Sequence, residues 1–253
     1  MKPTKISIII PVLNEAGKIR STLASLQDAS NVEVIVVDGG SQDETVAIVK
    51  PLGVQVLSSA AGRARQMNAG AKVATGDILL FLHADTHLPA GFDAMVRQAL
   101  AENSQEENYP IQNPIRGVKK RGESKIQNPI AGAFELRIDA QMRSLRLIEK
   151  MVNWRSRTLG MPYGDQAIFL KASVFHDLGG FPDLPIMEDF ELMLRLRRLG
   201  QIAIVPASVL TSGRRWQKLG VLKTTLINQM IIIAYFLGVS PTRLVRWYRN
   251  FLQ

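Results

Sequence analysis

The chain has 253 residues, of which 46% are hydrophobic and none is cysteine. This length suits one globular domain with or without an appendage, and the apolar content is enough for a sizeable core. The lack of cysteine excludes disulfides, zinc–thiolate sites and thiol nucleophiles. Residues 1–110 carry 9 Lys/Arg against 12 Asp/Glu, whereas residues 111–253 carry 22 against 10. The second half, at +12, favours an anionic partner, which leaves phosphate-bearing substrates, nucleic acids and membrane surfaces open.

The first apolar stretch, residues 6–13, begins close to the N-terminus. It is too short for a signal-peptide core followed by a cleavage site, so we expect a cytoplasmic protein. Its opening, residues 6–11, is an almost continuous apolar run and predicts a strand buried on both faces.

Strands and helices alternate through the first hundred residues. Ser41 and Glu44 form a capping box, which predicts that a helix begins at Ser41 and runs to about Leu52. Repeated βαβ units of this size predict an α/β fold with a mostly parallel sheet flanked by helices. After the first strand, the predicted elements are helix 18–26, strand 32–37, helix 41–52, strand 54–57, helix 63–74 and strand 78–82.

Residues 102–130 break this rhythm because they are polar and carry few large apolar side chains. The segment Ile-Gln-Asn-Pro-Ile occurs at 111–115 and again at 126–130, which is too short a repeat for a solenoid unit. We interpret these residues as a flexible surface insertion, and we expect a short Gly/Ser linker to replace them with little change in melting temperature.

The second half continues the alternation. Its predicted elements are strand 133–138, helix 139–156, strand 166–170, helix 188–199 and strand 202–205, followed by an apolar stretch at 219–238. Ser240 and Pro241 then open a last basic, aromatic helix, with serine as its cap and proline at its first position.

Polar residues follow the first two predicted strands, where ligands bind in open α/β sheets. Asn14 and Glu15 come after the first strand and can hold a base or a ribose, although a turn with a helix cap at Asn14 explains them equally. Asp38 ends the second strand and can accept hydrogen bonds from a ribose hydroxyl or a base. It can also simply begin the turn Gly39-Gly40-Ser41.

His83-Ala84-Asp85 follows the fourth strand. A carboxylate that emerges from a buried strand suits a hard cation such as Mg²⁺ or Mn²⁺, which would bridge substrate phosphates. The alternative is a His and an Asp that cap the next segment.

Two later segments carry further charged groups. Glu188 and Asp189 begin a predicted helix, where acids are favoured by the helix dipole and where one of them can act as a general base. Arg214 and Arg215, in the loop before Trp216, can clamp a diphosphate, or they can belong to a salt-bridged surface loop.

These motifs, in this order, resemble the family 2 inverting glycosyltransferases of the GT-A fold. The resemblance covers most of residues 5–216 outside the insertion. Its matching pieces are residues 11–15, Asp38, Asn68-Ala69-Gly70, Asp85, Gly164-Asp165-Gln166, Glu188-Asp189 and Arg215-Trp216.

The resemblance implies roles for these residues in transfer of a hexose from a nucleoside diphosphate sugar, most commonly UDP-linked, to a hydroxyl. Asp85 matches the second aspartate of the metal-binding Asp-x-Asp element, and Asp189 matches the catalytic base, with Glu188 beside it. Arg214 and Arg215 would stabilise the leaving diphosphate. We expect the nucleotide sugar to be bound by Pro11, Asn14, Glu15, Asp38, Arg63, Arg65, His83, Arg214, Arg215 and Trp216.

The sequence departs from the family pattern at several donor-site positions. His83 replaces the first aspartate of Asp-x-Asp, and Met67 stands where many members carry an arginine, so Arg63 or Arg65 is expected to contact the base instead. The full Gln-x-x-Arg-Trp form is absent, which argues against a long-chain polymerase. The chain resembles a small bacterial branch that includes enzymes proposed to glycosylate carotenoid acids.

Two other classes of protein share part of this pattern. A nucleotidyltransferase would carry a Gly-rich, Lys/Arg-bearing loop after the first strand, where this chain has Val12-Leu13-Asn14-Glu15. A nucleic-acid-binding protein would need a basic face with exposed aromatics or a recognition helix, and we see no such motif and expect no nucleic-acid partner.

The last part of the chain raises the question of a membrane. A spanning helix needs about 20 mainly apolar residues, and polar residues interrupt 219–238, so we expect that it does not cross. It is either a helix packed on the domain or one that lies on the bilayer. Arginines at 243, 246 and 249, among Trp247 and Tyr248, suit anionic lipid.

We therefore divide the chain into a GT-A domain, residues 1–216, and a C-terminal helical extension, residues 217–253. We predict peripheral contact with the inner face of the cell membrane and a lipid-linked or apolar acceptor. Binding to anionic vesicles is expected to be salt-sensitive and to be lost when residues 219–253 are removed.

Overall fold

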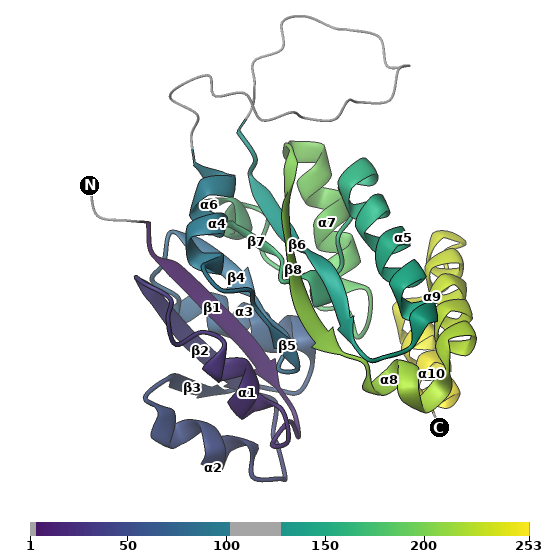
Figure 1. Cartoon of the computed structure of the whole chain (residues 1–253), viewed down its shortest axis with the longest axis horizontal. Helices are drawn as coiled ribbons and strands as arrows, with labels where there is room; N and C mark the ends of the chain where they lie inside the picture. The colour runs from purple at the N-terminus through teal and green to yellow at the C-terminus, as the bar shows by residue number, and fades with distance from the viewer. Residues whose placement is uncertain (1–3, 102–127, 253) are drawn as a thin grey trace, which may run out of the picture.

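The computed structural model describes residues 4–101 and 128–252. Within them, eight strands form one curled sheet in the order β3-β2-β1-β4-β7-β6-β8-β5, with helices on both of its faces (Figure 1). The predicted α/β fold class is confirmed. Most of the predicted insertion, residues 102–127, lies outside the described residues.

The N-terminal half of the sheet is parallel, as its βαβ rhythm predicts. It consists of β1 (Ile6–Val12), β2 (Val32–Asp38), β3 (Gln55–Ser58) and β4 (Ile78–Phe81). The other half is mixed. β6 (Ala131–Asp139) and β8 (Ile202–Ser212) are parallel, whereas β7 (Phe169–Lys171) is antiparallel to β4 and β6, and β5 (Thr86–His87) is antiparallel to β8.

Two apolar clusters, one on each face of the sheet, form the core. Successive residues of β1 alternate between them: Ile8 and Ile10 join the first cluster and Ile9 joins the second. The first cluster takes side chains from α1 (Ile19–Ala24), α2 (Thr45–Val49), α4 (Phe92–Leu100) and α5 (Arg143–Leu159). The second takes them from α3 (Arg63–Val73), α6 (Ala172–Asp177), α7 (Glu188–Leu199), α9 (Val221–Phe236) and α10 (Pro241–Leu252).

Three local predictions are wrong, each because a tertiary contact overrides the local signal. Ser41 does not cap a helix: its hydroxyl accepts from the Asn14 N–H (2.9 Å), and α2 begins at Thr45, before the 3₁₀ turn Lys50–Leu52. The residues from Asp139 to Met142 are not helical, because β6 extends to Asp139 by pairing with β8. The predicted strand at 166–170 is shortened by the 3₁₀ turn Gly164–Gln166.

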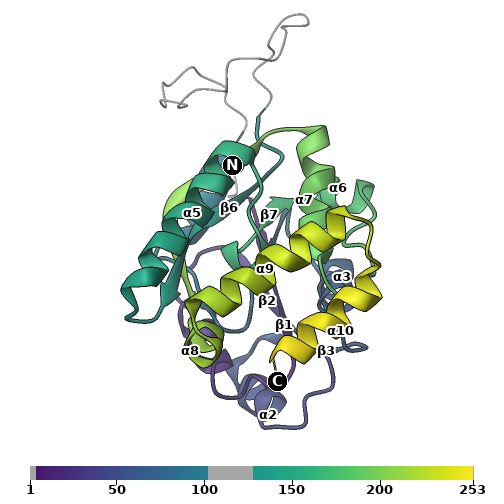
Figure 2. The ribbon, with the colours of Figure 1, turned by 90° about the vertical axis from the view of Figure 1, so that its right-hand side faces the viewer.

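The C-terminal residues form three helices that follow β8: α8 (Arg214–Leu219), α9 and α10. Figure 2 shows α9 and α10 side by side, running in opposite directions across one side of the molecule. Ile227, Ile231, Ala234 and Leu244 are buried in the second cluster. Among the described residues, no helix is long and apolar enough to span a membrane.

Candidate active site

The polar residues predicted after the strands lie at the carboxyl edge of the parallel strands. Val12 pairs with Asp38 at the ends of β1 and β2, and the Leu82 N–H donates to the Ile9 carbonyl just before His83. Parallel topology thus brings three separate loops to one edge, with Asn14, Asp38 and Asp85 upon them.

The first two loops are tied together by hydrogen bonds. Asn14, whose φ of 55° is left-handed, accepts from the Gln42 N–H through Oδ1 (2.8 Å). The buried Asp38 carboxylate accepts from the N–H groups of Gly40 (3.0 Å) and Ser41 (3.1 Å). These bonds match the turn interpretation of Asp38, and a carboxylate has lone pairs for further donors as well.

Helix α3 supports this edge from below. The fully packed Gln66 side chain donates to the Val12 and Val37 carbonyls, both at 2.8 Å, and so fixes the ends of β1 and β2. Gly70 lets the helix approach the sheet, because a Cβ there would lie 2.5 Å from Ile9 Cγ2. Asn68 binds the Phe181 backbone through both its N–H (2.9 Å) and its carbonyl (2.8 Å), which positions the loop before α7.

Arg214 links the first and third loops. Its guanidinium makes two hydrogen bonds to the Glu15 carboxylate (2.6 and 3.0 Å) and lies 3.3 Å from Asp85 Oδ2. The cation from the start of α8 therefore lies between two acids of the strand edge. Arg214, expected near a diphosphate, is held beside the carboxylate that is expected to bind the metal.

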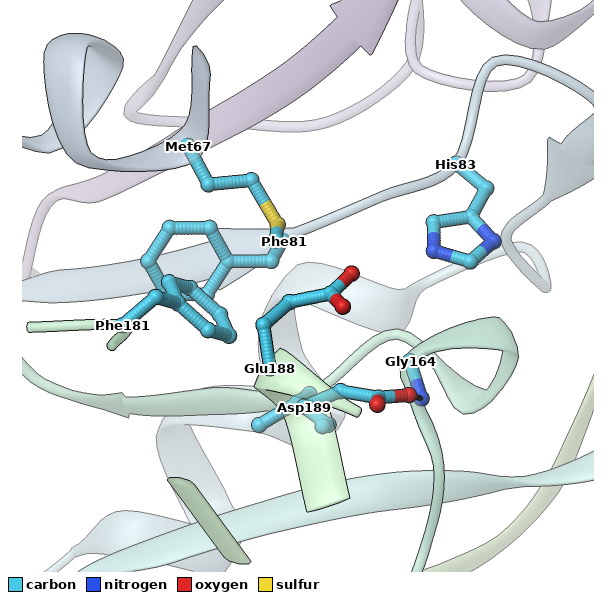
Figure 3. Close-up of a pocket in the computed structure, with 8 residues that line it drawn as sticks. Met67, Phe81, His83, Gly164, Phe181, Glu188 and Asp189 are labelled. Atoms are coloured by element: carbon cyan, nitrogen blue, oxygen red, sulfur yellow. Dashed lines mark hydrogen bonds between the residues drawn. The ribbon is translucent and has the colours of Figure 1, made fainter. Parts of the chain in front are cut away.

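A small pocket of about 10 Å³, the size of a single water, lies at this edge (Figure 3). Figure 3 shows Met67, Phe81 and Phe181 together on one side of it. The other lining residues are His83, Gly164, Ile168, Glu188 and Asp189. Burial, followed by the nearby Arg63, lowers the pKa of His83 to about 4, so this imidazole is neutral at pH 7.

Asp189 is held in place at the first turn of α7. Its Oδ2 accepts from the Gly164 N–H (2.7 Å), and its Oδ1 accepts from the Phe190 N–H (2.8 Å). Gly164 permits this contact because a Cβ there would lie 2.9 Å from Asp189 Oδ2 and 3.2 Å from His83 Nε2. The glycine brings a carboxylate and an imidazole to the same point from two distant segments.

Glu188 is almost fully buried, unlike its neighbour in sequence. Its Oε1 pairs with Arg63 Nε (2.7 Å), while Oε2 is buried and has no hydrogen-bond partner among the described residues. Burial raises the pKa of Glu188, although Arg63 acts in the opposite direction. A buried acceptor without a donor is costly, and a ligand hydroxyl would satisfy it.

Asp165 is a second acid with a buried oxygen, Oδ1, for which the described part of the chain supplies no hydrogen-bond partner. Burial raises its pKa, and Arg155 opposes the shift. Arg155 itself stacks on the Tyr163 ring, with 3.6 Å between its Cζ and the ring centroid. The motif Gly164-Asp165-Gln166 thus supplies an anchor for Asp189, an unsatisfied carboxylate and, at Gln166, a buried support that donates to the Phe134 carbonyl (2.8 Å).

Left-handed backbone conformations occur next to residues that line the pocket, at Ala167 and Met187, and in the loop after β1, at Asn14. Asn14, Ala167 and Met187 have φ of 55°, 50° and 69°, and they account for three of the four non-glycine residues with positive φ in the described chain. Met187 immediately precedes Glu188, and Ala167 follows the Gly164 turn. Strain of this kind concentrates at functional sites.

The remaining predicted residues lie outside the pocket lining. Arg65 makes a two-pronged, exposed pair with Asp183 (2.8 and 3.0 Å). Arg215 lies over the Tyr248 ring (5.5 Å), and the half-buried Trp216 packs on the first core cluster. Pro11 is buried within β1. Of the two arginines considered for the base, Arg63 is the one that reaches the acidic pair.

The donor set at Asp85 suits a hard cation that is completed by substrate. No group of three or more His, Asp or Glu that could hold a metal by itself occurs in the described parts of the chain. Mg²⁺ and Mn²⁺ sites of nucleotide enzymes commonly use one or two carboxylates and take the other oxygens from phosphates and water. Asp85, half-buried and 3.3 Å from the Arg214 guanidinium, fits that pattern.

Comparison with known proteins decides the family. The family model "Glycosyl transferase family 2" matches residues 7–173, about two thirds of the sequence. The chain belongs to glycosyl transferase family 2. Its fold is the GT-A fold, since it resembles a Pyrobaculum calidifontis mannosyltransferase solved with GDP-Man and Mn²⁺ (TM-score 0.62, 20% identity, 100% of this chain and 70% of that one).

Two curated relatives match about a third of this family 2 chain. A Mycobacterium bovis PGL/p-HBAD biosynthesis glycosyltransferase is 41% identical over 91 residues, which are 32% of this chain and 36% of that protein. A Staphylococcus haemolyticus 4,4′-diaponeurosporenoate glycosyltransferase is 35% identical over 92 residues, 33% of this chain and 24% of that one. The matches thus span about a third or less of these relatives.

The sequence predicts the acids at this edge of the family 2 chain but not the residues that support them. Gly164 and Asp165 are predicted only as part of a motif, and no role is predicted for the aromatic side, Phe81 and Phe181. The signal for Gly164 was a glycine beside an acid and before a short strand. No local signal marks Phe181, which reaches the pocket through its contact with Asn68.

Proposed function

We propose that the protein transfers a hexose from a nucleoside diphosphate sugar, most readily a UDP-linked one, to a hydroxyl or carboxyl of an acceptor, with inversion at the anomeric carbon. The observation that carries this proposal is the position of Asp189. A carboxylate fixed by Gly164 faces the same sheet edge on which Asp38 and Asp85 lie.

The donor would bind along the edge of β1, β2 and β4. Asn14, Glu15 and Asp38 would border the nucleoside, with Pro11 beneath them, and Arg63 would contact the base or sugar after β3. Arg65 would first have to leave Asp183, so we assign it the lesser part. His83, neutral at pH 7, can offer one hydrogen bond to the donor without adding charge.

Asp85 would hold a divalent metal, Mg²⁺ or Mn²⁺, which when bound supplies neutralisation of the leaving diphosphate. Arg214 already lies beside this carboxylate and would turn toward the phosphates, with Arg215 and Trp216 near the same end of α8. Binding of a diphosphate would therefore exchange the Arg214 contacts to Glu15 and Asp85 for contacts to phosphate oxygens.

Asp189 would act as the general base. The acceptor oxygen attacks the anomeric carbon, the bond from that carbon to the diphosphate breaks, and the acceptor proton passes to the Asp189 carboxylate. A single displacement from the face opposite the leaving group inverts the configuration. The unpartnered oxygens of Glu188 and Asp165 would accept hydrogen bonds from sugar hydroxyls and so orient the hexose.

The acceptor is proposed to be apolar or lipid-linked, and a carotenoid-type carboxyl is one candidate. The similarity to a glycosyltransferase named for 4,4′-diaponeurosporenoate supports this choice. The half-buried Tyr163 ring, which packs on Phe190 next to Asp189, supports it as well, because its exposed part would pack against an apolar molecule.

The test is a thermal shift of the full chain against UDP- and GDP-linked hexoses, with and without Mn²⁺. We expect a stabilisation by one nucleotide class that grows with Mn²⁺. In Asp85→Asn the Mn²⁺-dependent part should be lost, whereas the exposed control Asp183→Asn should keep it. A shift with nucleoside triphosphates but not with nucleotide sugars, or an equal Mn²⁺ effect in Asp85→Asn, would contradict the proposal.

A further inference from the structure

Helix α9 is apolar on two opposite sides. Its inner side buries Ile227, Ile231 and Ala234 in the second core cluster. Its outer side carries a second apolar stripe with a spacing of three or four residues, which reaches an exposed fraction of 81% at Leu222. A helix with such a stripe in water needs a cover on its outer side. The stripe consists of Leu222, Leu226, Met230, Ile233 and Leu237.

Helix α5 carries a second exposed apolar stripe on the side away from the sheet. Leu147, Met151 and Trp154 follow one another at four and three residues, and Trp154 is 63% exposed. The exposed cations Arg143 and Lys150 lie among them. Tryptophan, aliphatic residues and cations on one helix face are typical of helices that lie at a lipid–water interface.

The two stripes lie on the same side of the molecule, together with α10. Figure 2 shows α5, α9 and α10 on the side that faces the viewer. Helix α10 buries Leu244 and turns Arg243, Arg246 and Arg249 outward. We call the exposed side chains of these three helices the helical face.

The positive charge of the helical face indicates which kind of partner covers it. The residues after Glu191 include no Asp or Glu and ten Lys or Arg: Arg195, Arg197, Arg198, Arg214, Arg215, Lys218, Lys223, Arg243, Arg246 and Arg249. Within the described chain, no ion pair joins the three arginines of α10 to an acid. A second copy would place these cations against one another, whereas anionic lipid headgroups complement them.

A row of aromatic rings leads from the helical face to the site. Phe236, 66% exposed at the end of α9, packs on Phe190 with ring centroids 5.5 Å apart, and Phe190 packs on Tyr163 at 6.1 Å. Asp189 directly precedes Phe190, and Gly164 directly follows Tyr163. Phe190 itself is only 5% exposed and backs the other two rings. An apolar acceptor that rests on Phe236 and Tyr163 would present its polar end beside the Asp189 carboxylate.

We propose that the helical face docks the protein on an anionic lipid surface and that a lipid-class acceptor enters from it along Phe236 and Tyr163, the two rings that pack on the buried Phe190. Docking involves the aliphatic stripes of α5 and α9 in the acyl boundary and the arginines of α10 at the headgroups. The entry of the acceptor rests on the proposed function, whereas docking is measured without any turnover.

Docking is tested by co-sedimentation of the full chain with phosphatidylcholine vesicles, with and without phosphatidylglycerol, at low and high salt. We expect binding to the anionic vesicles at low salt only, with each removed arginine of α10 weakening it about fivefold. The pairs Met151→Glu/Trp154→Glu and Leu226→Glu/Ile233→Glu should each lose at least about tenfold. Leu52→Glu and Val73→Glu, which alter exposed apolar residues elsewhere, should bind as the parent does.

The parent chain in the supernatant with anionic vesicles at low salt would overturn the inference, as would unchanged binding by the Met151/Trp154 variant. A dimer in solution that the same substitutions dissociate would show that a second copy covers the face. Donor-dependent thermal shifts of each variant report the fold and the donor site independently, so a loss of docking with a retained shift leaves the proposed function standing.

The acceptor route is tested with Phe236→Ala. We expect the variant to keep its vesicle binding and its donor shift, and to lose about tenfold in transfer to a vesicle-borne acceptor alcohol but not to a short water-soluble one. Equal losses with both acceptors would overturn this part of the inference.

Discussion

The geometry of the pocket depends on a missing side chain at Gly164 and on two carboxylate oxygens that lack hydrogen-bond partners among the described residues. Gly164 contributes a backbone N–H to Asp189 and leaves the space in which the Asp189 carboxylate and the His83 ring approach each other. Glu188 and Asp165 bring buried oxygens that no group in residues 4–101 and 128–252 satisfies. These three residues define the arrangement of the site in more detail than the mere presence of several acids does.

Gly164→Ala should lower the transfer rate about tenfold to a hundredfold with little change in stability. The added Cβ would lie 2.9 Å from Asp189 Oδ2, so the end of that side chain must move, and misplaced catalytic groups cost rate steeply. Steady-state kinetics and a melting curve measure the two effects. A variant with parental turnover would show that the position of Asp189 is not critical.

Asp189→Asn should lower kcat about a hundredfold to ten-thousandfold and leave the donor dissociation constant unchanged, because a base acts only on the attacking acceptor. Glu188→Gln, which removes one partner of Arg63 but keeps the shape, should be milder in kcat and should weaken donor binding. Single-turnover rates and donor titrations separate the two. Parental turnover in Asp189→Asn would exclude it as the base.

At the scale of elements, some strands and helices follow from local sequence patterns, whereas the limits of others depend on pairing between distant segments. The apolar runs in the sequence predict the strands β1, β2 and β4. Because these strands are parallel, Asp38 and Asp85 lie on one edge of the sheet. Helix α7 begins at Glu188, as predicted, because its pattern is strongly periodic. By contrast, the extension of β6 to Asp139 depends on its pairing with β8, a segment more than sixty residues away in the sequence.

The site shows the same division. The positions of Asn14, Asp85 and Asp189 follow from where strands and helices end. The contact of Arg214 with Glu15 joins residues 199 positions apart, and no local pattern encodes it. The sequence also does not show which apolar residues of α9 are buried and which are exposed, because an apolar stripe has the same pattern whether it faces the core or solvent.

Glu33 of β2, which is hydrogen-bonded to Thr75 after α3, leads to a prediction for the pH dependence of stability. Burial by itself raises the pKa of Glu33, but hydrogen bonds from Lys5, Ser7 and Thr75 outweigh it and lower the pKa to about 2. The folded state therefore favours ionised Glu33, and its contribution, about 1–3 kcal/mol, is present above the unfolded pKa of 4.5 and is lost as pH falls from 4.5 toward 2.

Urea denaturation of the parent and of Glu33→Gln at several pH values measures this contribution. We expect the parent to be more stable at pH 7 and the gap to close below pH 4. A difference that stays constant from pH 7 to pH 3 would mean that the Glu33 charge does not drive it.

At the scale of the whole molecule, charge is divided between the strand edge and the C-terminal helices. Acids gather at the ends of β1, β2 and β4 and at α7, whereas the chain after Glu191 is purely cationic. Arg214, from the cationic part, contacts the acids Glu15 and Asp85 of the strand edge, and Arg195 pairs with Glu191 of α7. The C-terminal residues thus close one side of the site as well as the second core cluster.

This packing allows a test of the proposed boundary between residues 1–216 and 217–253. Leu244 is fully buried against the second core cluster, so Leu244→Ala should lower the free energy of unfolding by about 2–5 kcal/mol. Leu222→Ala, also in the C-terminal helices but 81% exposed, should change it by less than about 0.5 kcal/mol. Denaturant curves followed by circular dichroism and by donor binding measure both.

The denaturant curves distinguish two ways in which residues 217–253 can relate to the rest of the domain. If residues 217–253 are an integral layer of the domain, the Leu244→Ala transitions seen by the two probes coincide and shift together, and deletion of residues 219–253 destabilises the whole chain rather than only removing a lipid-binding tail. If they are an independent extension, Leu244→Ala melts α9 and α10 early while the donor site unfolds at the parental denaturant concentration. The burial of Ile227, Ile231, Ala234 and Leu244 in the same cluster as Met67 and Phe181 leads us to expect the first outcome.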